Sequence, residues 1–124
     1  SGELLDNAVV VDGLKVLAER IDVVSRNELR QMGDRLRDSL ESCVIVLGAV
    51  LEGKPALLAM VTPDAVRQGV RAGDIIREIA PEIDGRGGGR PELAEAGGKD
   101  PSGIDRALAA VIGVVNDKRS ARAS

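Results

Sequence analysis

The sequence lacks histidine, phenylalanine, tryptophan and tyrosine altogether. Without histidine there is no imidazole to act as a general base near neutral pH, and no histidine ligand for a metal ion. Without aromatic rings there is no platform on which nucleic-acid bases could stack. Most familiar enzyme active sites and most base-stacking RNA modules are therefore excluded.

Cysteine and long hydrophobic runs are also scarce. Cys43 is the only cysteine, so the chain can form neither an internal disulfide nor a Cys-x-x-Cys zinc site, and nothing indicates an oxidising compartment. No window approaches the roughly 20 consecutive apolar residues of a membrane span, and no signal-peptide pattern opens the chain. We expect a soluble, cytoplasmic protein that does not enter a membrane.

The chain has 124 residues, of which 44% are apolar and 30% charged, and this composition fits one domain with a modest core. Because it begins with Ser1 rather than Met, we expect a fragment of a longer protein. The net charge of -3 and the isoelectric point near 5.0 are not those of a dedicated nucleic-acid binder. Residues 85–124, however, carry seven basic and five acidic side chains. Any contact with a polyanion must therefore be confined to one part of the surface. From the charge alone, the simpler interpretation is that these side chains are only exposed to solvent.

The first half of the chain predicts two hairpins around one helix. Asp12-Gly13 separates two apolar-rich segments, 8–11 and 14–21, and is typical of a two-residue hairpin turn. Ser25 and Glu28 form a capping box, with Val24 and Leu29 at the positions of a hydrophobic staple. The helix that follows carries an apolar stripe at Leu29, Met32, Leu36 and Leu40. Residues 43–47 predict a central strand covered on both faces, and Glu52-Gly53 turns the chain into a strand over 56–61.

The second half predicts helices and a glycine-rich segment. Thr62-Pro63-Asp64 is a helix opening, and Asp74 can cap a second helical piece, so we expect a bent helical pair. From Gly85 to Gly98 a glycine cluster stands at each end of a short strand-like or loop segment. Asp100 and Pro101 cap a final helix whose buried stripe is Ile104, Leu108, Val111, Ile112 and Val115. Together these elements predict a single compact α/β domain, a mixed sheet of about five strands covered by helices, with a hairpin on either side of a parallel crossover.

Candidate chemistry is confined to the glycine-rich segment. Glycines 87–89 allow close approach of the backbone to a ligand, and Arg86, Arg90 and Lys99 could meet phosphates. A flexible linker and a tight structural turn are the alternatives. A dinucleotide-binding pattern starting at Gly85 meets Arg90 where a glycine is needed, and Gly98-Lys99 does not complete a P-loop. ATP binding by this segment is therefore not expected.

Catalytic and metal-binding groups are not predicted elsewhere. Cys43 has no histidine to activate it, and we expect a buried, inert thiol. Asp34 and Asp38 alternate with arginines, so ion pairs on a solvated helix face, in a ladder with Arg30, are the simpler interpretation than a metal site. We assign no catalytic residue and no metal ligand.

The order of several short segments resembles one known domain. Residues 86–91 and 96–98, Arg-Gly-Gly-Gly-Arg-Pro and Ala-Gly-Gly, are similar to the glycine-rich signature that ends bacterial alanyl-tRNA synthetases, a domain type shared with DHH phosphoesterases. Residues 12–17, Leu29-Arg30, 44–47, 52–54 and Ala72-Gly73 resemble the same domain in the same order. The resemblance spans roughly residues 8–115. One departure is Asp84, an added carboxylate that could weaken anion contacts beside the glycines.

The resemblance implies a non-catalytic tRNA-binding domain at the C-terminus of a ligase that joins alanine to its tRNA. In that family the domain touches the outer corner of tRNA and helps couple aminoacylation with editing, whereas ATP and zinc belong to upstream parts, and no cofactor is expected in this fragment. Residues 1–7 are interpreted as a remnant of an upstream helical part, 8–117 as the tRNA-binding domain and 118–124 as a basic tail. The upstream aminoacylation and editing domains and alanine-specific tRNA are the implied partners. Self-association stays open.

The residues expected to contact tRNA follow from this resemblance and from the charge pattern; they are Arg86, Gly87, Gly88, Gly89, Arg90, Gly97, Gly98 and Lys99. A bulky side chain at Gly88 is expected to block backbone approach or to force an unfavourable φ. Two other functions stay open: a phosphoesterase accessory domain that holds single-stranded nucleic acid or a small phosphoester, and a pure self-association module. A chain without aromatic residues would read RNA through shape, phosphates and arginine planes.

Overall fold

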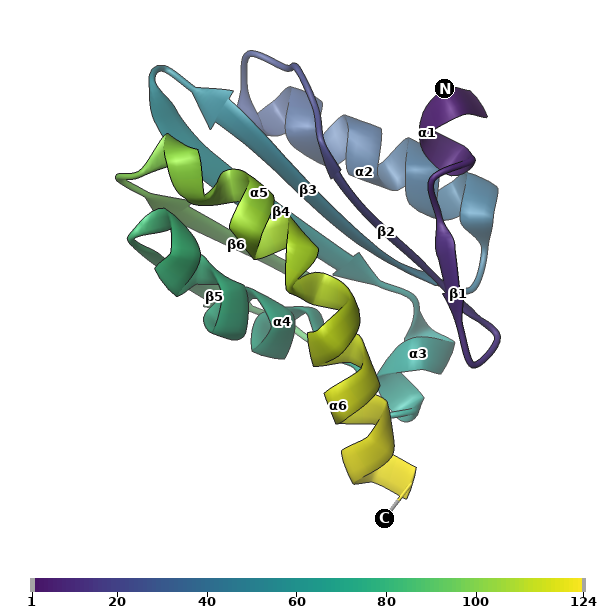
Figure 1. Ribbon diagram of the computed structural model, residues 1–124. Helices are drawn as coiled ribbons and strands as arrows, with labels where there is room; N and C mark the ends of the chain where they lie inside the picture. The colour runs from purple at the N-terminus through teal and green to yellow at the C-terminus, as the bar shows by residue number, and fades with distance from the viewer. Residues whose placement is uncertain (1, 124) are drawn as a thin grey trace.

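A computed structural model of the chain describes residues 2–123 and contains one six-stranded sheet of order β1-β2-β3-β4-β6-β5 (Figure 1). β2 and β3 are parallel and every other neighbouring pair is antiparallel. The α/β class and the two hairpins beside one parallel crossover are confirmed. There are six strands rather than about five, because both halves of the glycine-rich segment pair as strands. The strands are β1 (Val9–Val11), β2 (Leu14–Arg20), β3 (Cys43–Leu51), β4 (Lys54–Val61), β5 (Gly85–Gly89) and β6 (Leu93–Gly98).

Helices cover both faces of the sheet, which gives three layers (Figure 1). The crossover helix between β2 and β3, α2 (Arg26–Leu40), lies on one face, with the short α1 (Gly2–Leu5) beside it. The opposite face carries α4 (Ala72–Ile79), α5 (Ile104–Ala109) and α6 (Val111–Ala123). Short connecting elements are α3 (Pro63–Arg67) and the 3-10 turns η1 (Ala80–Ile83) and η2 (Pro101–Gly103).

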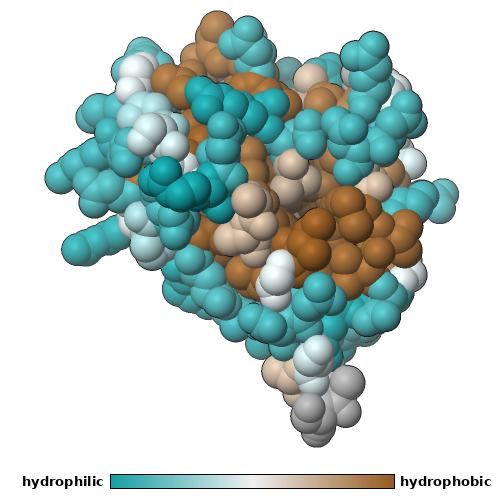
Figure 2. Space-filling view, viewed as in Figure 1, coloured by the Kyte–Doolittle hydropathy of each residue, from teal (hydrophilic) through white to brown (hydrophobic). Residues whose placement is uncertain are grey.

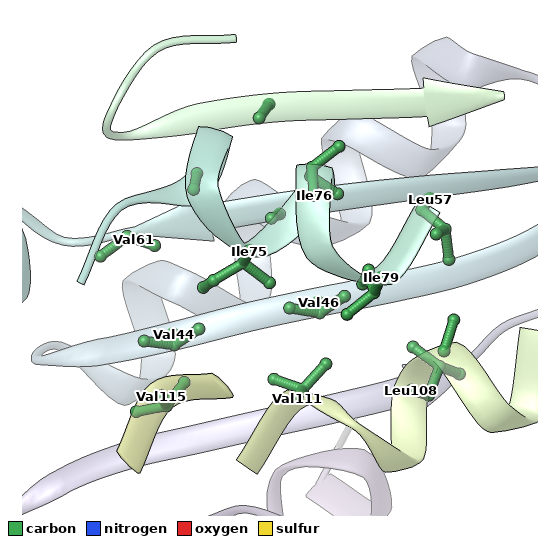
Figure 3. Close-up of a cluster of buried hydrophobic side chains, with 14 of the residues drawn as sticks. Val44, Val46, Leu57, Val61, Ile75, Ile76, Ile79, Leu108, Val111 and Val115 are labelled. Atoms are coloured by element: carbon green, nitrogen blue, oxygen red, sulfur yellow. The ribbon is translucent and has the colours of Figure 1, made fainter. Parts of the chain in front are cut away.

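The sheet separates two hydrophobic clusters. On the α2 side, Ile45 and Leu47 of β3 pack with Leu29 and Leu36. On the other side, Val44 and Val46 of the same strand meet isoleucines of α4 and the inner face of α5 and α6 (Figure 3). β3 is therefore buried on both faces, as its continuous apolar sequence predicts.

The start of α2 follows its capping signal only in part. The Ser25 hydroxyl accepts a hydrogen bond from the Glu28 backbone N–H at 3.1 Å, which confirms the cap. The Glu28 carboxylate reaches the Val24 backbone N–H at 2.8 Å rather than that of the cap residue. The Val24 side chain is 77% exposed, so the predicted staple contributes little apolar burial.

Two other helix predictions need correction. α4 begins at Ala72 with Arg71 as its cap, because the carbonyls of Arg90 and Pro91 accept from its first N–H groups and Asp74 is not needed there. The final helix is divided at Ala110 into α5 and α6.

On α2, Arg37 rather than Arg30 pairs with the acidic side chains of the predicted ladder. Arg37 lies 3.0 Å from Asp34 and 3.6 Å from Asp38. The Arg30 side chain instead extends toward β6, where its guanidinium lies 2.7 Å from the Glu95 carboxylate.

Exposed apolar side chains gather at the β1 edge of the sheet. Val9 and Val10 are 45% and 65% exposed, and Figure 2 shows a hydrophobic area over this strand. Within residues 2–123, no helix is both long and apolar enough to cross a membrane.

Candidate nucleic-acid interface

The glycine-rich segment is an ordered hairpin at one edge of the sheet. β5 pairs antiparallel with β6, with Arg86 opposite Gly97 and Gly88 opposite Glu95. β6 in turn pairs with β4, so the hairpin is continuous with the core sheet. The linker and tight-turn interpretations of this segment are therefore wrong.

Most of the glycines are required by backbone packing inside the protein. A Cβ added to Gly87 would lie 2.5 Å from both the Cα and the Cβ of Ala96, and would clash with the Glu95 carbonyl as well. A Cβ on Gly89 would lie 2.6 Å from the Leu93 carbonyl oxygen, and Gly89 also has a φ of +153°. A Cβ on Gly85 would clash with the Gly97 carbonyl oxygen of β6, and one on Gly98 would clash with the Ile83 carbonyl oxygen of η1. These glycines bring β5 against β6, and their presence alone does not identify a ligand site.

Gly88 and Gly97 differ from these four. A Cβ on Gly88 would meet only the Arg77 guanidinium, at 3.7 Å, and its φ is not in the left-handed region. The expectation that a side chain at Gly88 forces an unfavourable φ is therefore wrong. The space beside Gly97 is taken by the guanidinium of Arg26, whose Nη2 would lie 3.0 Å from an added Cβ.

A groove of about 880 Å³ lies where the end of β3, the start of α2 and the β5–β6 hairpin meet. Of the predicted residues it brings together Arg86, Gly97, Gly98 and Lys99. Lys54, at the start of β4, lines the same groove. Within the described part of the chain no carboxylate lies within ion-pair distance of Lys54, Arg86 or Lys99. Three cations without an ion-pair partner among the described residues therefore share one concave surface.

Arg26 forms one wall of this groove and is held in place by β6. Its Nη1 lies 3.1 Å from a Glu95 carboxylate oxygen, and Arg30 binds the other oxygen of the same carboxylate at 2.7 Å. The Glu95 side chain is only 20% exposed. Two arginines on one carboxylate leave a local excess of positive charge and tie the first turns of α2 to the hairpin.

Two acidic side chains also line the groove and lower its net positive charge. Asp84, beside Gly85, lines the groove, so the extra acidic residue noted in the sequence does belong to this surface. Glu52, in the β3–β4 turn, is the other. Next to Lys99, hydrogen bonds from the Ser102 hydroxyl and backbone N–H hold the pKa of Asp100 below its ordinary value. That carboxylate caps η2 and lies outside the groove.

Arg90 does not share the groove. It lies in a separate hollow of about 310 Å³, together with Gly89, Arg71 and Arg77, at the other end of β5. The sequence prediction of one surface formed by Arg86, Arg90 and Lys99 is therefore corrected to two basic surfaces. The sequence does not predict Lys54, Arg71 or Arg77, because each is an isolated cation in its own segment. The pairing of β4 with β6 brings Lys54 to the hairpin, and the packing of α4 against the β5–β6 turn brings Arg71 and Arg77.

The remaining candidate groups are structural. Cys43 is buried, and burial raises the pKa of its thiol to about 11, in keeping with an inert side chain. The Ser42 hydroxyl donates to Asp64 and holds the pKa of that carboxyl below its usual value. Residues 2–121, whose side chains are described, contain no group of three or more acidic or cysteine side chains that could hold a metal ion.

Comparison with known proteins agrees with this fold. The chain is 50% identical over 111 residues to an alanine–tRNA ligase of Bacillus cytotoxicus, and 44% identical over 118 residues to one of Thiobacillus denitrificans. These alignments cover 90% and 95% of the chain but only 13% of each ligase. The chain thus spans about one eighth of the length of these relatives.

A solved structure gives the same assignment for the whole fold. The C-Ala domain of the Aquifex aeolicus alanyl-tRNA synthetase superposes with a TM-score of 0.73 at 26% identity, over 90% of this chain and 97% of that one. The expected resemblance to the C-terminal domain of alanyl-tRNA synthetases is confirmed. The DHHA1 domain pattern matches residues 13–117, nearly all of the sheet and its covering helices. The chain therefore belongs to the DHHA1 domain family.

Proposed function

We propose that this chain is the C-terminal domain of an alanine–tRNA ligase and that it binds tRNA through the groove beside the β5–β6 hairpin. The observation that carries the proposal is the grouping of Lys54, Arg86 and Lys99, none with an ion-pair partner among the described residues, around one concave surface. Phosphate contacts from lysine and arginine supply most of the affinity of a protein that cannot stack bases on rings. The relatives of this chain are ligases for tRNA, and that supports tRNA as the partner.

The domain has a positioning role in this proposal. It holds the outer corner of the tRNA, while the catalytic and editing domains of the parent enzyme act on the acceptor end, and so helps couple aminoacylation with editing. ATP and zinc belong to those other domains. The parent enzyme works in the cytoplasm, where tRNA is charged.

Removing two groove cations tests the proposal. Arg86→Ala combined with Lys99→Ala is expected to weaken binding of a tRNA(Ala) transcript about tenfold or more at 0.1 M salt, because two phosphate contacts are lost. The log-log slope of affinity against salt should become shallower by about 1.4 to 1.8 units, since each contact contributes about 0.7 to 0.9. Titrations between 50 and 200 mM KCl measure both quantities.

Lys15→Ala combined with Arg35→Ala is the matched control. It removes the same charge as the groove variant, and both side chains are exposed. In the sheet, Lys15 of β2 lies opposite Cys43, at the start of β3. The groove lies at the other end of that strand, at Leu51, about 26 Å away at 3.3 Å per residue. The control should change affinity less than about twofold. If both variants lost the same affinity for tRNA, the loss would be explained by the change in net charge. The groove would then be overturned as the binding surface.

A further inference from the structure

A second cluster of arginines lies at the opposite end of β5 from the groove. Arg71 is the residue before α4, Arg77 lies about 1.7 turns further on, and Arg90 follows β5. All three are exposed and line one hollow of about 310 Å³. Within residues 2–121, Arg71 and Arg90 have no ion-pair partner.

Backbone hydrogen bonds hold this cluster together. The N–H of Ala72 donates to the Pro91 carbonyl at 2.7 Å, and the N–H of Gly73 donates to the Arg90 carbonyl at 3.2 Å. The β5–β6 turn is thereby docked onto the first turn of α4, and Arg71 and Arg90 stay close neighbours. Since protein carbonyls already occupy these N–H groups, the guanidinium groups, and not the helix end, are the groups left to bind a ligand.

Arg77 completes the cluster from the side. Its Nη1 would lie 3.5 Å from a Cβ added to Gly73 and 3.7 Å from one added to Gly88, so its guanidinium lies over the glycine backbone of β5. It pairs with Asp74, but its side chain is 58% exposed. An exposed pair of this kind is weak, and a guanidinium has five N–H donors, so Arg77 retains donors for another acceptor.

We propose that Arg71, Arg77 and Arg90 form a second phosphate-binding site for the RNA backbone, separate from the groove. This inference rests on the proposed function. Arg86 and Arg90 are four residues apart along an extended strand, which places their Cα atoms about 13 Å apart at 3.3 Å per residue. The two clusters therefore lie at opposite ends of β5, and the strand sets the spacing between them.

The test compares two double variants with the control already described. Arg71→Ala combined with Arg90→Ala leaves the Arg77–Asp74 pair intact and is expected to weaken binding of the tRNA(Ala) transcript about tenfold or more at 0.1 M salt. Its salt slope should become shallower by about 1.4 to 1.8 units. Arg71→Lys with Arg90→Lys should restore the slope, because the charge is retained. Because distant sites act independently, combining Arg71→Ala and Arg90→Ala with Arg86→Ala and Lys99→Ala should multiply the two losses.

The outcomes separate the inference from the proposal on which it rests. If the unaltered chain does not bind the transcript, both are overturned. If it binds, and the Arg86 and Lys99 variant is weakened while the Arg71 and Arg90 variant behaves like the Lys15 and Arg35 control, the second site alone is overturned. Unchanged urea-unfolding midpoints should accompany every variant, since all the substituted side chains are exposed.

Discussion

Gly87→Ala is expected to lower the free energy of unfolding by about 3 kcal/mol. The new methyl group would lie 2.5 Å from the Cα and Cβ of Ala96, and neither atom can rotate away. Overpacking typically costs about 1–3 kcal/mol, and the upper end applies because the obstructing atoms are backbone or fixed to it. Urea unfolding measures the loss, and amide exchange should become faster along β6 as the hairpin opens.

Gly88→Ala is the matched control, one position along the same strand. Its methyl group would find only the Arg77 guanidinium at 3.7 Å, which is ordinary contact. Stability should stay within about 1 kcal/mol of the unaltered protein and can rise, because alanine reduces the freedom of the unfolded chain. Equal effects of the two substitutions would show that β5 does not pack against β6 as described.

Leu47→Ala is expected to cost about 3 kcal/mol, within a range of about 2 to 5 for a leucine truncated in a core. Leu47 is 0% exposed, lies in the middle of β3 opposite Leu58, and packs in the cluster beneath α2. The lost contacts leave a cavity that a central strand cannot close by moving. Urea unfolding gives the change as a lower midpoint with an unchanged m value.

Val24→Ala provides the comparison for Leu47. Val24 is 77% exposed, so its truncation should cost less than about 0.5 kcal/mol. A loss below about 0.5 kcal/mol for Leu47→Ala as well would contradict the burial of β3 on both faces.

The sequence predicts the elements of this fold wherever one local signal decides them. The continuous apolar run of β3 and the turns at Asp12-Gly13 and Glu52-Gly53 place four strands correctly. The capping box at Ser25 places α2. β5 escapes prediction because glycine has a low preference for strands, and the tertiary packing against Ala96 overrides that preference.

The candidate site is less predictable than the fold. Arg86 and Lys99 were predicted from the glycine signature and do meet in the groove, but Arg90 is carried to the far end of β5. Sequence proximity misleads here, because four residues of extended strand place the two Cα atoms about 13 Å apart. Lys54 reaches the groove only through the sheet order, which places the start of β4 beside the end of β6. Such long-range pairings leave no local signal.

The reactivity of the buried Cys43 thiol reports how often the folded chain opens. Alkylating reagents attack the thiolate, and in the folded chain the Cys43 thiol is both covered and held in its protonated form, with a pKa of about 11. Once β3 separates from its neighbours, the thiol regains its ordinary pKa of about 8.5 and becomes reactive. Because the sequence has one cysteine, each molecule that opens gains one alkyl group. The fraction of molecules with that added mass therefore equals the fraction that has opened.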